Sequence, residues 1–284
     1  MNKKSHFIET KEYKKFAEFC DACAEFKYIG ICHGLPGVGK TISARQYANW
    51  DYTHSKIKEF SVYRDQGKNI EDDTILKSNT IFYTAPSVRP ARLYDMINRT
   101  CFDLQMSKDG YLAIRDKYEN DWATSFQKAD NFSTVDLIII DEIDRLKFPT
   151  LEILRDIYDK HSIGMVFIGM PGIEKRISRY PQLYSRVGFI HEFKKLTPTE
   201  MKHILTYKWE KLGNTLQYEN FEDYEAVNTI IKISRGNFRL LERLFSQIER
   251  IMKMNNIKRE VCKIADFSFY PYAIYHLKTA QIIS

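Results

Sequence analysis

The chain has 284 residues, of which 44% are hydrophobic and 28% charged, and its formal net charge is +6. This length and apolar content are those of a globular chain with room for one large domain and a small one. The longest apolar run, Leu137 to Ile140, is far too short to cross a bilayer, and no apolar run follows the lysines of the start MNKKSHFIETKEYKK. We therefore expect a cytoplasmic protein without a membrane partner, whose modest positive charge permits a polyanionic partner without requiring one.

The first predicted element is an amphipathic helix from about Lys11 to Phe26, and it carries two of the five cysteines. An odd number of scattered cysteines is typical of reduced thiols rather than of a disulfide framework. Cys20, Cys23, Cys32 and His33 could be proposed as a zinc site. The alternative is a core face, and helical spacing favours it for Phe16, Phe19, Cys20, Cys23 and Phe26.

Five short apolar runs predict buried strands, and helical segments separate most of them. A helix from Lys40 to about Trp50 follows the first strand, an irregular insertion covers Asp51 to Asn79, and later helices begin at Pro90 and near Tyr111, the last reaching Lys128. Strands that alternate with helices predict an α/β fold with a parallel sheet. The predicted strands are Tyr28–Cys32, Thr80–Ala85, Val135–Ile140, Met165–Gly169 and Val187–Phe193.

The chain becomes helical at Thr197, where TPTE combines an N-cap threonine, a proline at the first helical position and Glu200 three residues after the cap. Further on, an apolar face continues for some four turns from Phe238 to Met252, which predicts a small helical domain. We therefore expect an N-terminal helical segment over residues 1–27, an α/β domain over 28–193, a helical domain over 194–256 and a tail over 257–284.

The segment GLPGVGKT has the spacing G-x-x-x-x-G-K-T and stands between a predicted strand and a predicted helix. Its glycines allow backbone N–H groups to curl around phosphate oxygens, and the helix that follows presents its positive end to the anion. Lys40 would reach the β and γ phosphates, and Thr41 would offer its hydroxyl to Mg²⁺. The segment predicts an ATP site made of Gly34, Leu35, Pro36, Gly37, Val38, Gly39, Lys40 and Thr41.

Two carboxylates, Asp141 and Glu142, follow the strand LIII. In a parallel sheet ligands gather at the carboxyl ends of the strands, where the glycine-rich loop also opens. Asp141 would hold Mg²⁺ through water, and Glu142 would orient or deprotonate the water that attacks the γ phosphate. The alternative is an acidic turn without function, which the glycine-rich loop about a hundred residues upstream disfavours.

Taken together, GLPGVGKT, IDEID, RYPQLYSRVG and SRGNFR resemble the AAA+ ATPases over roughly residues 28 to 255. The resemblance implies a P-loop NTPase core with a central parallel five-stranded sheet and a small C-terminal helical lid domain. It also implies that Arg186 reaches the ATP of a neighbouring subunit, with Arg176 and Arg179 as rivals, and that Arg239 reads the γ phosphate from the lid. For each arginine the alternative is a solvent-exposed charge.

One segment departs from the AAA+ pattern. The family usually ends its fourth strand with a polar residue that helps to position the attacking water, whereas this chain has Ile168-Gly169-Met170-Pro171. The departure implies hydrolysis that is slow or depends on a partner. Thr84, at the end of the second predicted strand, is a polar group that could restrain Glu142 until a partner binds.

Within AAA+ proteins, IDEIDRLK, FIGMPG, RYPQLYSRVG with a following HEF, and GNFRLLERL are similar to the transposition regulators of the TnsC, TniB and Mu B type. This resemblance implies binding of ATP with Mg²⁺, assembly into a ring or helical filament on double-stranded DNA, and presentation of that DNA to an integrase-like transposase. DNA contact would be mainly to phosphates. The candidate DNA-binding residues are Arg89, Arg92 and Arg99, and an ordinary solvated basic helix is the alternative.

Besides a small-molecule kinase, for which no segment suggests a phosphoacceptor pocket, two other functions stay open from the sequence. One is a helicase loader or an origin-recognition-like ATPase, and the other is a signalling or defence module that uses ATP as a conformational lock with little turnover. The tail after Asn256 is too short for the winged-helix domain that origin-recognition proteins often carry. The apolar end of the fourth strand favours the ATP lock slightly, and the positive net charge opposes it.

Overall fold

The computed structural model describes residues 7–62, 73–86, 91–115, 131–212, 216 and 218–254. The chain divides into two compact units. The sheet unit consists of Tyr13–Gly34 and Lys40–Glu192, and the helical unit consists of Met1–Glu12, Leu35–Gly39 and Phe193–Ser284. The glycine-rich loop therefore takes part in both, since its tip belongs to the helical unit and its two ends to the sheet unit.

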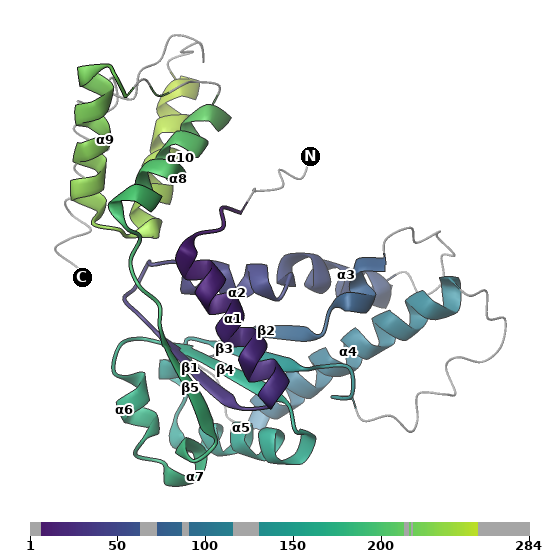
Figure 1. Cartoon of the computed structure of the whole chain (residues 1–284). Coiled ribbons are helices and arrows are strands. Elements are labelled where there is room, and N and C mark those ends of the chain that lie inside the picture. Colours follow the sequence, from purple (N-terminus) through teal and green to yellow (C-terminus); the bar gives the residue numbers. More distant parts are fainter. Residues whose placement is uncertain are drawn as a thin grey trace. The chain divides into compact units, whose positions relative to one another are not determined.

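A parallel sheet of five strands forms the centre of the sheet unit, in the order β2-β3-β4-β1-β5 (Figure 1). The predicted α/β fold with a parallel five-stranded sheet is confirmed, and each strand lies within two residues of its predicted position. The strands are β1 Ile29–His33, β2 Thr80–Thr84, β3 Leu137–Asp141, β4 Gly164–Gly169 and β5 Val187–Glu192.

Burial along the strands follows this order. Every residue of β3 and β4 is buried, as expected for central strands covered on both faces. The edge strand β5 alternates between half-buried and exposed residues. Helices lie on both faces of the sheet (Figure 1). They are α1 Lys11–Phe26, α2 Lys40–Tyr47, α3 Trp50–Val62, α4 Ala91–Arg115, α5 Phe148–His161, α6 Ile173–Ile177 and α7 Pro181–Tyr184, with 3-10 turns η1 Asp73–Lys77 and η3 Ile143–Arg145.

Two sequence predictions about helices are wrong. The expected irregular insertion contains α3 and η1, because Trp50 and Ile57 bury one face of α3 together with Thr53, whose hydroxyl lies 2.9 Å from that of Ser78. A polar residue within the buried stripe weakens the apolar period that sequence reasoning relies on. The helices expected from Pro90 and from Tyr111 are one helix, α4, as far as Arg115, and residues 116–128 lie outside the described part.

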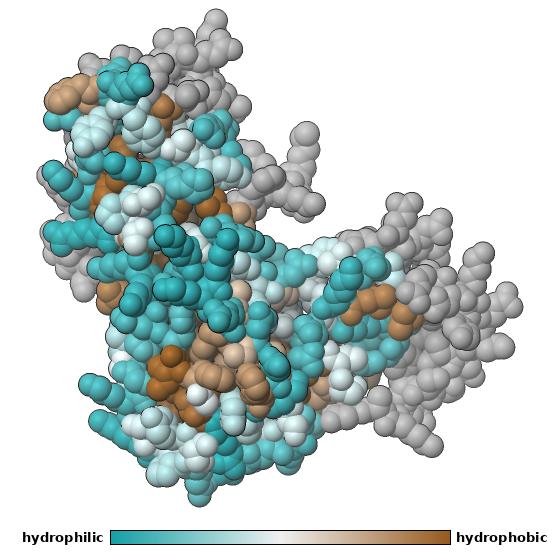
Figure 2. Space-filling model, in the orientation of Figure 1, coloured by the Kyte–Doolittle hydropathy of each residue, from teal (hydrophilic) through white to brown (hydrophobic). Residues whose placement is uncertain are grey.

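The apolar face predicted for the first helix is confirmed over most of its length. Phe16, Phe19, Cys20 and Cys23 are buried, whereas Phe26 is 58% exposed. Phe26 instead joins Tyr28 and Phe189 in a cluster of rings at the edge of the sheet. The Phe189 ring centroid lies 6.3 Å from that of Phe26 and 5.8 Å from that of Tyr28. On the face drawn in Figure 2, apolar residues gather in the region of β5 and the end of α1.

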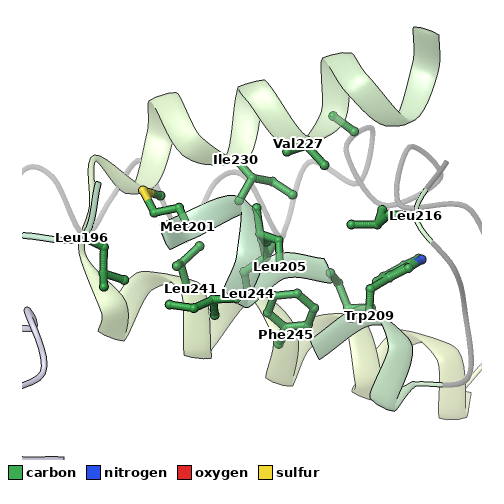
Figure 3. Packing of buried hydrophobic residues seen from close by; sticks show 13 residues of the cluster. Leu196, Met201, Leu205, Trp209, Leu216, Val227, Ile230, Leu241, Leu244 and Phe245 are labelled. Atoms are coloured by element: carbon green, nitrogen blue, oxygen red, sulfur yellow. The ribbon is translucent and has the colours of Figure 1, made fainter. Parts of the chain in front are cut away.

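The helical unit is built around three helices, α8 Pro198–Lys211, α9 Phe221–Ser234 and α10 Phe238–Met254. Their apolar faces meet in one core, in which Leu205 and Trp209 of α8, Val227 of α9 and Leu241 of α10 are fully buried (Figure 3). The predicted capping box at Thr197 is confirmed, because the Thr197 and Glu200 side chains each bond the other residue's backbone N–H. Among the described residues no helix combines the length and the apolar character that crossing a bilayer requires.

Candidate functional site

The loop between β1 and α2 has the backbone that its glycine pattern predicts. Gly37 and Gly39 have φ angles of 78° and 116°, in a region that side chains other than hydrogen strongly disfavour. Helix α2 begins at Lys40, directly after this turn, so its first N–H groups and its positive dipole end lie at the loop. The Lys40 Nζ atom donates a hydrogen bond to the Gly34 carbonyl at 2.5 Å, which brings the ammonium group to the start of the loop.

Thr41 and Asp141, which are 100 positions apart in sequence, meet at the carboxyl edge of the sheet. The Thr41 hydroxyl donates to Oδ2 of Asp141 at 2.6 Å, and the Glu142 N–H donates to Oδ1 at 2.8 Å. Asp141 is the last residue of β3 and is only 3% exposed. The hydroxyl of the exposed Thr41 and the buried carboxylate of Asp141 therefore meet beside the loop that ends at Lys40.

The environment of Asp141 suits a divalent cation. Burial raises the pKa of the Asp141 carboxyl group, although the hydrogen bonds from Thr41 and Glu142 and the Lys40 charge act in the opposite direction. A cation bound to the carboxylate would offset the cost of burying its charge. Because Mg²⁺ prefers oxygen ligands and is often held by few protein groups together with substrate phosphates, Thr41 and Asp141 fit that ion. Among the residues with described positions, no group of three or more His, Cys, Asp or Glu could hold a metal.

Glu142 is held by a neighbour that sequence reasoning did not single out. Its backbone is left-handed, with φ 58° and ψ 40°, and its carboxylate forms an ion pair with Arg145 in the turn η3. Arg145 also donates to the Ala85 carbonyl, directly after β2, at 3.4 Å. Thr84 is exposed, and no hydrogen bond within the described part of the chain joins it to Glu142. In this structure Arg145 is therefore the residue that restrains Glu142. Its position three residues after Glu142 is the sequence feature from which this ion pair could have been predicted.

The three arginines considered as trans-acting groups differ in their contacts. Arg186 donates from Nε and NH2 to the two carboxylate oxygens of Asp159 at 2.6 and 2.8 Å, and these hydrogen bonds raise its pKa. Arg176 donates to the backbone carbonyls of Asp144 and Leu146. Arg179 is exposed, and its guanidinium forms no hydrogen bond or ion pair to a described residue. Arg186 is the candidate with a carboxylate partner on its own subunit.

Within the helical unit, the start of α10 contacts the tip of the glycine-rich loop. The Asn237 side chain donates to the Pro36 carbonyl at 3.1 Å and accepts the Leu240 N–H at 3.3 Å, so that it contacts the loop and caps the helix. The Arg239 N–H donates to the Gly37 carbonyl at 3.0 Å, while the Arg239 side chain is exposed. In the sequence, Asn237 stood out only as one letter of the segment SRGNFR.

The three candidate DNA-binding arginines are not equivalent. Arg92, in the first turn of α4, is exposed and has no hydrogen bond or ion pair to any described residue. Arg99 forms an ion pair with Asp103 at 2.9 Å, and its guanidinium lies over the Phe102 ring. Arg89 lies outside the described residues. Of the two arginines that the structure places, Arg92 is therefore the one whose charge has no partner among the described residues.

Comparison with known proteins agrees with this arrangement. A family model described as AAA domain matches residues 25–177, which is more than half of the chain. A Staphylococcus aureus protein named "Potential ATP-binding protein" is 52% identical over 259 residues, and the match covers 91% of this chain and 93% of the relative.

Solved structures show the same fold at low sequence identity. The Thermotoga maritima RuvB Holliday junction branch migration motor is 19% identical, with a TM-score of 0.53 over 97% of this chain and 70% of its own. For the Aeropyrum pernix ORC1 protein in complex with DNA, identity is 16% and the TM-score 0.52, over 95% of this chain and 64% of that one. The ADP form of Aeropyrum pernix ORC2 is 13% identical, with a TM-score of 0.55 over 94% and 70%. From the glycine-rich loop, the sheet order, the family match and the 52% identical relative, the chain belongs to the AAA domain family of P-loop ATPases.

Proposed function

We propose that this AAA+ ATPase binds ATP with Mg²⁺, assembles on double-stranded DNA in its ATP-bound form, and presents that DNA to an integrase-like transposase. The observation that carries the nucleotide part is the contact of Thr41 with buried Asp141 next to Lys40. The DNA part is supported by the exposed Arg92, which has no ion pair with a described residue, and by the net charge of +6. The transposase part depends on the segments IDEIDRLK, FIGMPG, RYPQLYSRVG and GNFRLLERL.

In this structure, the groups that would hold the nucleotide form hydrogen bonds with other groups of the same site. Lys40 would exchange the Gly34 carbonyl for phosphate oxygens, and the backbone N–H groups from Gly37 to Lys40 would donate to the same anion. Thr41 and Asp141 would exchange their mutual hydrogen bond for Mg²⁺. Bound Mg²⁺ would neutralise phosphate charge during hydrolysis.

Hydrolysis would require Glu142 to change partner. As a general base, Glu142 must accept a hydrogen bond from the attacking water, whereas its carboxylate is here paired with Arg145. Arg145 also contacts the Ala85 carbonyl, six residues before the basic start of α4 at Ala91. DNA bound at this basic start could therefore alter the position of Arg145 through a short segment of chain. This connection would make hydrolysis depend on DNA.

Two further arginines would make the assembly sensitive to ATP. Arg186 would leave Asp159 and contact the γ phosphate held by the neighbouring subunit. Arg239, whose side chain is exposed, would contact the phosphate from the lid of the same subunit. ATP would then link subunits, and hydrolysis would weaken the link.

The decisive experiment measures binding to labelled duplex DNA with ATP, with ADP and without nucleotide, over a series of salt concentrations, with the particles viewed by electron microscopy. We expect binding that requires ATP, weakens steeply with salt and yields rings or filaments. Lys40→Ala should abolish the ATP dependence. ATP binding without DNA binding under all three conditions would contradict the DNA part of the proposal and leave the ATPase part standing.

Variants with the same charge change separate a local DNA contact from the effect of net charge. Arg92→Glu should reduce DNA affinity and lower the slope of log K against log salt by about 1, the value expected for the loss of one phosphate contact. The control is Lys160→Glu, because Lys160 is an exposed cation on α5 in the same unit. Equal effects of the two variants would contradict a DNA contact at Arg92.

The transposase step needs its own measurement. DNA coated by the ATP-bound protein should receive more strand-transfer products than naked DNA when a transposase of the same mobile element and its end DNA are added. Equal transfer to coated and naked DNA would contradict this step while leaving DNA binding intact.

An ATP-locked signalling module is a second candidate, and the pairing of Glu142 with Arg145 favours it. In that case ATP would bind and change the conformation without turnover. Single-turnover hydrolysis with and without duplex DNA distinguishes the two functions, because the lock predicts no release of phosphate in either condition.

A further inference from the structure

The carboxylate of Asp144 occupies the place that a side chain at the end of β4 would take. A Cβ atom added to Gly169 would come within 2.7 Å of Oδ2 of Asp144. The same Oδ2 accepts a hydrogen bond from the Met170 N–H at 2.7 Å. The turn η3 therefore supplies a carboxylate to the space that a side chain at position 169 would occupy.

This space lies between the two strands that carry the candidate nucleotide-binding groups. Strand β4 pairs with β3 on one side and with β1 on the other. Strand β3 ends at Asp141, and Gly169 is in register with His33, directly before the glycine-rich loop. In a parallel sheet a ligand at this edge lies over the carboxyl ends of the central strands. A polar group at the end of β4 is thus placed between the loop and Asp141.

The backbone and one carboxylate oxygen of Asp144 are held by hydrogen bonds, and the other carboxylate oxygen has acceptor capacity left. Arg176 NH1 donates to the Asp144 carbonyl at 2.6 Å and NH2 donates to the Leu146 carbonyl, which fixes the backbone of the turn. Oδ1 forms no hydrogen bond with any described residue, and the side chain is half-buried. A carboxylate oxygen can accept a hydrogen bond from water at such a position.

We propose that Asp144 is a second acceptor for the attacking water in ATP hydrolysis, a role that rests on the proposed ATPase function. The water oxygen forms a bond to the γ phosphorus as the bond from that phosphorus to the bridging oxygen breaks. One water proton passes to Glu142, and the other hydrogen is held by Oδ1 of Asp144, which takes no proton. The electron pair of the broken bond stays on ADP. Two acceptors fix the direction of the water lone pair, whereas Glu142 alone leaves it free to rotate.

Three full-length variants test this role by steady-state ATP hydrolysis and by binding of a fluorescent non-hydrolysable ATP analogue. Asp144→Ala should lower kcat at least about tenfold and leave the affinity for the analogue within about twofold. Gly169→Ala should have the same effect, because its methyl group would displace the carboxylate. The double variant Asp144→Ala with Gly169→Asn should regain part of the lost kcat, because it returns a polar side chain to the same space from β4.

The matched control is Glu174→Ala. Glu174 accepts the Gly172 N–H at 3.1 Å, so it also ties a side-chain carboxylate to the backbone of the segment after β4. We expect kcat of Glu174→Ala within about twofold of the unmodified protein. A role for Asp144 that is only structural predicts losses in analogue affinity and melting temperature along with kcat, and no recovery in the double variant.

The possible failures are distinguishable. An unchanged kcat in Asp144→Ala, with hydrolysis by the unmodified protein abolished by Lys40→Ala, would overturn the role of Asp144 and leave the ATPase function intact. A loss of kcat without recovery in the double variant would also overturn it. Hydrolysis by the unmodified protein no faster than by Lys40→Ala, with and without duplex DNA, would overturn the ATPase function and with it the role of Asp144.

Discussion

Asp141 illustrates how a buried carboxylate that is suited to a ligand costs stability. Because its pKa is raised by burial, the folded chain binds a proton at this position more readily than the unfolded chain does. The ionised carboxylate therefore disfavours folding at neutral pH. The penalty is present above the folded-state pKa and disappears as the pH falls below the unfolded-state value of about 3.9.

Asp141→Asn should therefore stabilise the nucleotide-free protein and abolish its response to Mg²⁺-ATP. We expect the free energy of unfolding to rise by about 1 kcal/mol at pH 7, as is common when a functional site is removed, with the gain shrinking toward low pH. Urea denaturation at several pH values measures it. Asp51→Asn is the control, because Asp51 is exposed and pairs with Arg45 at the surface. A less stable Asp141→Asn protein would contradict this account.

Substitutions of Arg145 and Thr84 should affect basal hydrolysis differently. If the ion pair with Arg145 keeps Glu142 from the attacking water, Arg145→Ala should raise the rate without DNA up to about fivefold, since such partly exposed pairs are worth about 0.2–1 kcal/mol. Thr84→Ala should leave the rate unchanged. The measurement is phosphate release at saturating ATP, with analogue affinity as the check on binding. A lower rate in Arg145→Ala would mean that Arg145 positions Glu142 for the reaction.

At the level of elements, the capping box at Thr197 determines how firmly α8 begins. Thr197→Ala should cost about 1 kcal/mol locally, and exchange of the Glu200 amide hydrogen should accelerate roughly fivefold in native-state measurements. Thr206→Ala is the control, because its hydroxyl contacts the Lys202 carbonyl and the Tyr218 hydroxyl and not the Glu200 amide. Equal exchange rates in the two variants would contradict the capping role.

Glu200 gives this helix start a pH dependence. Burial would raise the pKa of Glu200, but hydrogen bonds from the backbone and hydroxyl of Thr197 and from the Lys11 N–H outweigh it and lower the pKa. The resulting stability is present above the unfolded-state pKa of about 4.3 and is lost as the pH falls through the folded-state value. The difference between Glu200→Gln and the unmodified protein should accordingly shrink in acid.

Some elements of the fold can be predicted from the sequence and others cannot. The strands and the glycine-rich loop were predictable, because continuous apolar runs and fixed glycine spacing depend on local residues alone. Helix α3 was missed because Thr53 and Ser78 bury a polar pair within its packed face. Arg145, Asp144 and Asp159 were missed because their significance depends on contacts made only in the folded chain, such as the pairing of Asp159 with Arg186 across 27 positions.

At the scale of the whole molecule, assembly would require Arg186 to exchange Asp159 for the ATP of a neighbouring subunit. In the isolated subunit it makes two hydrogen bonds to Asp159, and in the proposed assembly it contacts the neighbour's ATP. In the proposed assembly, Asp159 would therefore compete with the neighbour's ATP for Arg186, and it would set the threshold at which ATP links subunits. This competition would keep the protein from assembling when the γ phosphate is absent, because ADP offers Arg186 less negative charge than ATP does.

Removing each partner in turn tests the competition. Arg186→Ala should abolish ATP-dependent assembly, whereas Asp159→Asn should lower the protein concentration needed for assembly by up to about fivefold, because the pair is partly exposed. Light scattering and electron microscopy at increasing protein concentration measure both. Asp156→Asn is the matched control on the same helix, since Asp156 pairs with Arg155 and not with Arg186. If Asp159→Asn assembled less readily than Asp156→Asn, the ion pair would be holding Arg186 in the geometry that the neighbour needs, and the arginine would act together with Asp159 rather than after leaving it.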